Sequence, residues 1–275
     1  MADPINLSSS VRTNLLTLQR TSGFIADTQT RLSTGLRVNT ALDDAAAFFT
    51  AKGLSDTATD FDALKSNIDL AISTIQTAID GIDAISELVN QAKGLASNAK
   101  ATGNTNERST LAVQFNELLS QINTIANDSS FNGTNLLQAT PDNLAVEFNT
   151  DNTSNLTITG LDSTTATSGI NIAVAANNFG LNANIDTALT AISSALTTLR
   201  SNASTMGSRN TILSTRLDFT ENLVNTLEGG TGKLTLADLN EESANLLALQ
   251  TRQQLGINSL ALAAQSERSI LALFG

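Results

Sequence analysis

The side chains of this chain that could do chemistry are carboxylates, hydroxyls and amides. The chain has 275 residues and contains no histidine, cysteine, tyrosine or tryptophan. A Ser-His or Cys-His nucleophile pair and a zinc site of the usual ligands are therefore excluded. Asp and Glu remain for acid–base work, but they are scattered among Asn, Gln, Ser and Thr, and no paired-carboxylate site stands out. We therefore expect a protein that is not an enzyme and that has no catalytic residues, no cofactor and no bound metal.

Two short segments suggest a ligand site, and both fail on spacing. Glu228-Gly-Gly-Thr-Gly-Lys233 is like a phosphate-binding loop, but position 227 is Leu where the first glycine should stand. It also lies between two predicted helices rather than after a strand. Asp151-Asn-Thr-Ser-Asn155 lacks the glycine and the last glutamate of a calcium loop. We interpret the first segment as a break between helices and the second as a solvated turn.

The charge and hydropathy of the chain exclude several partners. Its formal net charge is −11, whereas nucleic acids and anionic membrane surfaces attract clustered Lys and Arg. No apolar run approaches the ~20 residues of a membrane span. The segment from Met1 to Leu16 has neither the basic nor the apolar region of a cleavable signal peptide. We expect no nucleic acid, no membrane insertion and no cleaved signal.

Residues 5–34 predict a helix with an apolar residue at every seventh position. This period is typical of coiled-coil packing, although an ordinary amphipathic helix explains it equally well for this segment alone. Gly35 stands where a helix C-cap would, and residues 38–43 form a predicted linker before the next helix. The expected seam residues are Val11, Leu15, Leu18, Ile25 and Leu32.

Longer helices are predicted over residues 44–98 and 182–228, with a shorter one between them that folds back antiparallel. Apolar residues recur at spacings of three and four through all three segments. The predicted core residues are Ile68, Ile75, Ile82, Val89, Leu111, Leu118, Ile125, Ile192, Leu199, Met206, Leu213 and Leu217.

Residues 140–178 differ from the rest because they are rich in Thr, Ser, Asn and Asp. Short alternating segments at 144–148, 156–159 and 170–174 predict hairpin strands, and Asn132-Gly133 predicts a turn just before them. The predicted fold class is therefore mainly α: a long antiparallel coiled-coil helical bundle with a small β-hairpin region, which we expect to face solvent.

The segment 234–275 predicts a final helix that is apolar on most sides. Leu239, Leu246, Leu260 and Leu271 form one stripe, and the apolar residues outside it are Leu247, Leu249, Leu255, Leu262, Ile270, Leu273 and Phe274. Such a helix has to be buried on most sides, so we expect it to pair with the N-terminal helix and to be covered further by other copies. Head-to-tail contacts of this kind build open helical polymers. The expected assembly residues in this segment are Leu246, Leu249, Ile257, Leu260, Leu271 and Phe274.

Several short motifs occur in order over nearly the whole chain. Arg31-Leu-Ser-Thr-Gly-Leu-Arg-Val-Asn39 with Asp43-Asp-Ala-Ala46 is similar to the N-terminal signature of bacterial flagellin. Ser130-Phe-Asn-Gly-Thr-Asn-Leu-Leu137 is similar to its FNG turn. Leu249-Gln-Thr-Arg-Gln-Gln-Leu-Gly-Ile257 and Ser269-Ile-Leu-Ala-Leu-Phe274 resemble its C-terminal end.

This resemblance implies a structural subunit that polymerises into the flagellar filament for swimming motility. It implies export, unfolded, through the flagellum's own channel, with an export apparatus, an export chaperone and a cap protein as partners besides the chain itself. Residues 1–37 and 234–275 would form an inner coiled coil, joined by linkers at 38–43 and 229–233 to a rod domain at 44–228. The space at 140–180 is too short for the family's large outer domains, so a short flagellin is expected.

Two departures from the family's pattern carry expectations. Ala47 stands where the family usually has a glycine, which would alter the start of the rod helix. Gln91 and Gly94 stand where well-recognised members carry a basic and an acidic residue for an immune receptor, so poor sensing by that receptor is expected.

Alternatives to a filament subunit fit less well. A hook–filament junction protein shares the terminal helices, but the FNG turn and the final LALFG fit the filament protein better. A membrane-inserting translocator would need an apolar segment of about twenty residues. A flagellin with an inserted metalloprotease would need the His-Glu-x-x-His motif, which a chain without histidine cannot contain.

Overall fold

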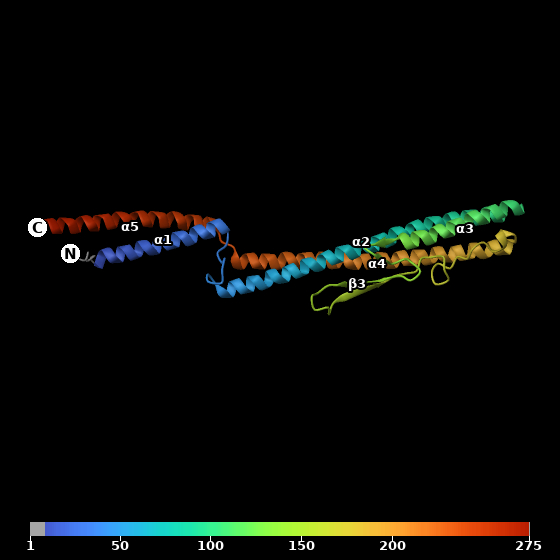
Figure 1. Cartoon of the computed structure of the whole chain (residues 1–275), viewed down its shortest axis with the longest axis horizontal. Helices are drawn as coiled ribbons and strands as arrows, with labels where there is room; N and C mark the ends of the chain where they lie inside the picture. The colour runs from blue at the N-terminus through green and yellow to red at the C-terminus, as the bar shows by residue number, and fades with distance from the viewer. Residues whose placement is uncertain (1–8, 275) are drawn as a thin grey trace. The chain divides into compact units, whose positions relative to one another are not determined.

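The computed structural model describes residues 9–274 and is dominated by long α-helices (Figure 1). The helices are α1 (Ser9–Thr34), α2 (Ala45–Ala101), α3 (Thr105–Asp128), α4 (Asn182–Thr235) and α5 (Leu239–Phe274). The predicted mainly helical fold is confirmed. The chain divides into two compact units, one made of residues 58–225 and the other of the residues before 58 and after 225.

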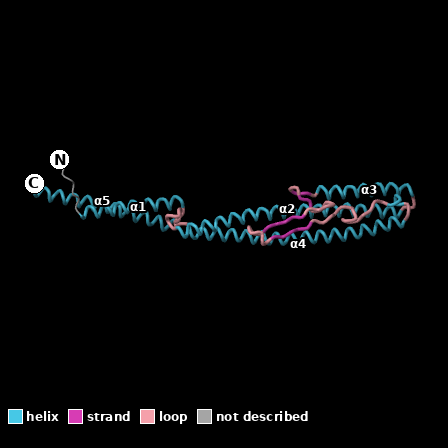
Figure 2. Tube along the Cα trace, turned by 60° about the horizontal axis from the view of Figure 1, so that its bottom comes forward, coloured by secondary structure: helices cyan, strands magenta, loops and turns pink. Residues whose placement is uncertain are grey.

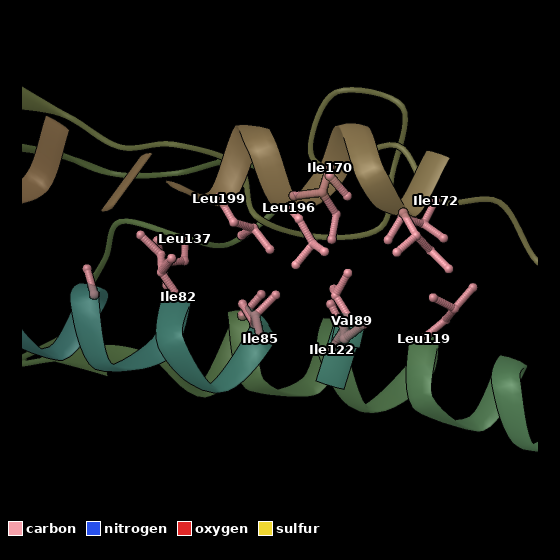
Figure 3. Packing of buried hydrophobic residues seen from close by; sticks show 14 of the residues in the cluster. Ile82, Ile85, Val89, Leu119, Ile122, Leu137, Ile170, Ile172, Leu196 and Leu199 are labelled. Carbon is pink, nitrogen blue, oxygen red and sulfur yellow. The ribbon is translucent and has the colours of Figure 1, made fainter. Parts of the chain in front are cut away.

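The core of the 58–225 unit is the seam that the heptad spacing predicted. Ile68, Ile75, Ile82 and Val89 of α2 are fully buried. Apolar side chains of α2, α3 and α4 pack together with those of the intervening loops in one hydrophobic core (Figure 3). Ion pairs join α2 to an antiparallel α4 near both ends of the unit. They are Lys65–Glu221 and Lys100–Asp186. On α4, the buried predicted residues are Ile192, Leu199, Met206 and Leu213, and Leu217 is half-buried.

Helix α3 turns a slightly different face to the core than its leucines and isoleucines predicted. Leu111, Leu118 and Ile125 are only half-buried. The residues that directly follow them, Ala112, Leu119 and Ala126, are buried instead. Two of these are alanines, whose small side chains let the helices approach closely. The ring of Phe115 packs edge-on against Phe179, with 5.2 Å between ring centroids. The buried residues of α3 are Ala112, Phe115, Leu119, Ile122 and Ala126.

Two hairpins follow α3. Strands β1 (Ser130–Phe131) and β2 (Thr134–Asn135) are joined by Asn132 and Gly133, whose φ angles of 49° and 81° both lie in the left-handed region. The two-residue Asn-Gly hairpin turn requires this backbone, so the predicted turn is confirmed. Strands β3 (Asn143–Glu147) and β4 (Asn155–Thr159) pair antiparallel and bury one face, through Val146 and Ile158. The hairpin of β3 and β4, whose strands are magenta in Figure 2, therefore faces solvent on one side only.

The third predicted strand, residues 170–174, is wrong. Ile170 and Ile172 are both buried, which explains their alternation, but the backbone here forms a loop. The Ile170 N–H donates to Thr164 O rather than to a neighbouring strand. Side-chain amides of α3 hold this loop, since Asn123 Oδ1 accepts from the Thr165 N–H and Asn116 Oδ1 accepts from the Ala175 N–H, each at 2.8 Å.

The predicted linker at 229–233 is also wrong, because α4 continues through the glycine run to Thr235. Each glycine costs a helix about 1 kcal/mol relative to alanine. Packing against the first turns of α2 offsets this cost. A Cβ on Gly230 would lie 3.3 Å from the Leu54 side chain, and Thr231 lies beside Ala51. The chain breaks instead at residues 236–238, where Asp238 accepts the Asn240 N–H at the start of α5.

Candidate assembly surface

Helices α1 and α5 lie side by side and antiparallel, and both belong to the unit that combines the two ends of the chain (Figures 1 and 2). On α1, Val11, Thr21 and Thr28 are buried. The predicted Leu18, Ile25 and Leu32 are half-buried, while Leu15 remains exposed. The heptad seam of α1 therefore alternates apolar residues with threonines, and the Thr21 hydroxyl donates to Thr17 O within the helix.

The inward face of α5 contains three of its six predicted assembly residues. Leu246, Leu249 and Leu260 are half-buried against α1, whereas Ile257 is exposed. Leu249 thus lies with the inward stripe, although its spacing placed it outside that stripe. The side chains of Leu271 and Phe274 lie outside the described residues.

Two contacts that the sequence analysis missed join the pair. Arg31 Nη1 lies 3.1 Å from Glu242 Oε1, with the Glu242 side chain 9% exposed and that of Arg31 41% exposed. Leu18 lies over Gly256, so that a Cβ on the glycine would come within 2.8 Å of Leu Cδ2. The available signal was position: Glu242, Leu249 and Gly256 are seven residues apart on one face of α5.

The outward face of α5 carries an apolar stripe that no part of residues 9–274 covers. Leu247, Leu255 and Leu262, spaced eight and seven residues apart, are 67%, 64% and 67% exposed. Leu16 and Phe24 are exposed on α1 in the same unit. Monomeric proteins rarely leave large side chains in such rows, and an uncovered row marks an interaction site. We call Leu247, Leu255 and Leu262 the outer stripe.

Backbone bonds between the connectors hold the base of the pair together. Leu36 and Leu236 form an isolated antiparallel bridge, and the Ala237 N–H donates to Gly35 O at 3.0 Å. In the connector between α1 and α2, Asp43 Oδ2 accepts from the N–H groups of Asn39 and Thr40 and from the Thr40 hydroxyl. The Thr40 backbone bond, followed by those of Asn39 and the hydroxyl, lowers the pKa of Asp43 below its ordinary value.

Helix α2 begins within one residue of its predicted start, in spite of the alanine at position 47. Asp44 Oδ1 accepts the Ala47 N–H at 3.0 Å, which is the bond of an N-cap residue. The rings of Phe48 and Phe49 then stack edge to face in the first turn.

Gln91 and Gly94 lie on the exposed face of α2, where they line a groove of about 620 Å³ shared with α3. Half-buried Leu95 and Leu118 form its floor, and Glu117 is the one ionisable residue among those that line it. An added Cβ on Gly94 meets nothing within 4 Å, so packing does not require a glycine there.

Within the described part of the chain, no three or more acidic side chains gather as a metal site would need. None of the helices over residues 9–274 combines the length and the apolarity that a membrane crossing requires.

Comparison with known proteins places these elements in one family. The sequence profile of the bacterial flagellin N-terminal helical region matches residues 5–142, and that of the C-terminal helical region matches residues 189–274. Flagellin FljM of Caulobacter vibrioides is 35% identical, with 98% of each chain covered, and a flagellin of Brucella melitensis is 31% identical, with 97% of each covered. A crystal structure of Bacillus cereus flagellin aligns with a TM-score of 0.49 at 21% identity, covering 56% of this chain and 88% of that one.

Proposed function

This chain belongs to the bacterial flagellin family, and from that premise we propose that its paired terminal helices are the device through which copies assemble. The protein is a structural subunit of the flagellar filament, in a short form without large outer domains. The observation that carries the proposal is the outer stripe of α5, which its own chain leaves in water. Nothing among the observations favours a hook–filament junction protein.

The physical driving force is the burial of that stripe. Covering a leucine side chain fully contributes about 1.5–3 kcal/mol. Within residues 9–274 the outer stripe is exposed, because α1 lies against the opposite face of α5. We infer that the contact that covers the stripe joins unlike faces of two copies, head to tail, with a rotation that does not close into a ring.

The charge distribution supports an inner position for the terminal helices. Residues 58–225 hold seven of the fifteen Lys and Arg and sixteen of the twenty-six Asp and Glu, a net charge of −9, which leaves −2 for the rest of the chain. Copies repel one another through like charge. We therefore assign residues 1–37 and 234–275 to the packed interior of the filament and the acidic helices of 44–228 to its outer part.

The family implies self-polymerisation and an extracellular filament. Beyond that, we assign export through the flagellum's own secretion channel, with an export apparatus, an export chaperone and a cap protein as partners. We also propose that the chain has no enzymatic activity, because it belongs to a structural family and contains neither histidine nor cysteine.

Electron microscopy tests the proposal directly. The purified full chain, seeded at neutral pH, is compared with a version that ends after Leu236 and so keeps all of α4. We expect filaments from the full chain and none from the truncation. Filaments from both would contradict the assembly role of α5, and filaments from neither, with a stable monomer, would favour the junction protein.

The groove beside Gln91 and Gly94 carries a second proposal, that the flagellin immune receptor senses this chain poorly. Gln91 and Gly94 are neutral, and the resemblance implies that well-recognised members carry a basic and an acidic residue at these positions. A cell reporter assay is expected to give weak activation, rising when Gln91→Arg and Gly94→Glu are introduced together. Full potency of the unmodified chain would refute this.

A further inference from the structure

The seam between α1 and α5 does not by itself fix how the two helices align. On α1, the half-buried residues Leu18, Ile25 and Leu32 repeat every seven positions, and so do the buried residues Thr21 and Thr28. Sliding α5 by seven residues therefore brings a similar residue against each position. Repeats of this kind need an additional feature to specify register.

Two contacts break the repeat. The first is steric: Leu18 fills the space that Gly256 leaves, and the residue one heptad earlier on α5 is Leu249. A slip in that direction would set Leu249 against Leu18, where two leucines would have to share the space now held by a leucine and a glycine. Overpacking of this kind is destabilising.

The second contact is electrostatic. The Glu242 carboxylate is almost buried and has Arg31 as its ion-pair partner. The same slip would place Glu242 beside Phe24, where a carboxylate would lie unpaired against an apolar ring. The opposite slip would carry Glu242 past Thr34, where α1 ends, and leave Arg31 facing Leu249. An unpaired charge taken out of water is costly, so the first slip is rejected on this ground as well, and the opposite slip is disfavoured because it loses the ion pair.

We propose that Arg31–Glu242 and Leu18–Gly256 act together as a register lock for the terminal pair, with these four as positioning residues for assembly. The contacts lie thirteen residues apart on α1 and fourteen apart on α5, so both define one antiparallel register. The inference rests on the proposed function, because only copies with the same register present the outer stripe at the same place.

Because the chain contains no cysteine, introduced cysteine pairs report the register without background. Thr28→Cys with Leu246→Cys stand opposite one another in the register that Leu18 and Gly256 define. Thr28→Cys with Gln253→Cys, and Thr21→Cys with Leu246→Cys, would meet only after a slip of one heptad in either direction. Disulfides form only between Cα atoms within about 7 Å. In the full-length monomer, the first pair is expected to cross-link at least about tenfold faster than either slipped pair.

Charge changes then test the lock. The measured quantity is the ratio of the cross-linking rate of the first cysteine pair to that of either slipped pair. Arg31→Glu is expected to lower this ratio by about tenfold, and adding Glu242→Arg is expected to restore it. Gly256→Leu should also lower it, with rescue by Leu18→Ala. Lys52→Glu is the matched control, since it breaks an exposed pair with Asp56 within α2 and should leave the ratio unchanged.

Each outcome decides the matter. A ratio near one in the unmodified background, a ratio that ignores both Arg31→Glu and Gly256→Leu, or a failed charge-swap rescue would overturn the lock. If the lock is overturned in one of these ways and the full chain still forms filaments, the proposed filament function stands without the lock. If the ratio behaves as expected and the full chain forms no filaments under any seeded condition, the proposed function fails while the lock stands.

Discussion

The guanidinium of Arg31 lies 3.1 Å from the carboxylate of Glu242, a residue 211 positions further along the chain. The Glu242 side chain is far less exposed than that of Arg31, so the two partners are not equivalent. Removing the arginine leaves a nearly buried carboxylate unpaired, whereas removing the glutamate leaves an arginine that water can reach.

From this asymmetry we expect Arg31→Met to destabilise the terminal pair by about 1–3 kcal/mol and Glu242→Gln by less. Urea unfolding followed by far-ultraviolet circular dichroism measures the difference, since the chain has no tryptophan for fluorescence. Equal losses for both variants would mean that the buried carboxylate is not the controlling group.

Substitutions on the two faces of α5 should have separable effects. Leu255→Asp places a charge on the outer stripe, so it should leave the monomer's helicity unchanged and raise the concentration needed for polymerisation more than about tenfold. Leu260 lies on the inward face, so Leu260→Asp should both hinder polymerisation and weaken the α1–α5 pair. Leu271→Asp is also expected to block polymerisation. In all three the helices of 58–225 should stay folded.

The measurements are sedimentation of polymer and circular dichroism of the monomer. Gln254→Asp adds the same charge at an exposed polar position of α5 and is the control. Normal polymerisation of Leu255→Asp would remove the outer stripe from the assembly surface.

Asn135 is the residue on which the FNG turn depends most. It is buried, its amide donates to Ala126 O and Asn127 O, and its Oδ1 accepts from the N–H groups of Leu137 and Gln138. Replacing it with alanine leaves buried backbone groups unpaired.

Asn135→Ala should therefore cost about 2–4 kcal/mol in the unfolding of the 58–225 unit. Asn67→Ala, at an exposed position of α2, should stay within about 0.5 kcal/mol of the original chain. Urea denaturation of both variants gives the comparison, and similar midpoints would contradict the role given to Asn135.

Much of the fold follows from periodicity in the sequence, because long seams such as Ile68 to Val89 allow only one helical face to be buried. The incorrect predictions concern segments whose backbone conformation is determined by tertiary contacts. Ile170 and Ile172 alternate like a strand, yet amides of α3 hold their backbone as a loop. The glycine run weakens a helix locally, and its packing on Leu54 was invisible in sequence. The candidate site divides in the same way, since exposed leucines can be expected from composition, whereas Gly256 becomes meaningful only opposite Leu18.

The Asp43 turn gives an expected pH dependence. Its hydrogen bonds are made to the charged carboxylate and hold its folded pKa below the ordinary 3.8. Because the folded pKa is depressed, the turn's contribution is fully present above that ordinary value and is lost as the pH falls through the folded pKa. The protection factor of the Asn39 and Thr40 amides, which is the intrinsic exchange rate divided by the observed one, should therefore fall below about pH 4. In Asp43→Asn the protection should be low already at neutral pH, and a protection factor that does not change with pH in the original chain would contradict the assignment.

Assembly should change the dynamics of the terminal helices more than those of the middle ones. In the free subunit, α1 and α5 share a threonine-containing seam and leave the outer stripe in water, so little apolar burial opposes their opening. The α2 seam from Ile68 to Val89 is fully buried within one chain and gains nothing from neighbours. Hydrogen exchange by mass spectrometry is therefore expected to be fast in residues 9–34 and 239–274 of the monomer and slow in the filament, with residues 68–89 slow in both. Equally slow exchange of the terminal helices in both states would mean that the single chain already buries them, and the outer stripe would then need another explanation.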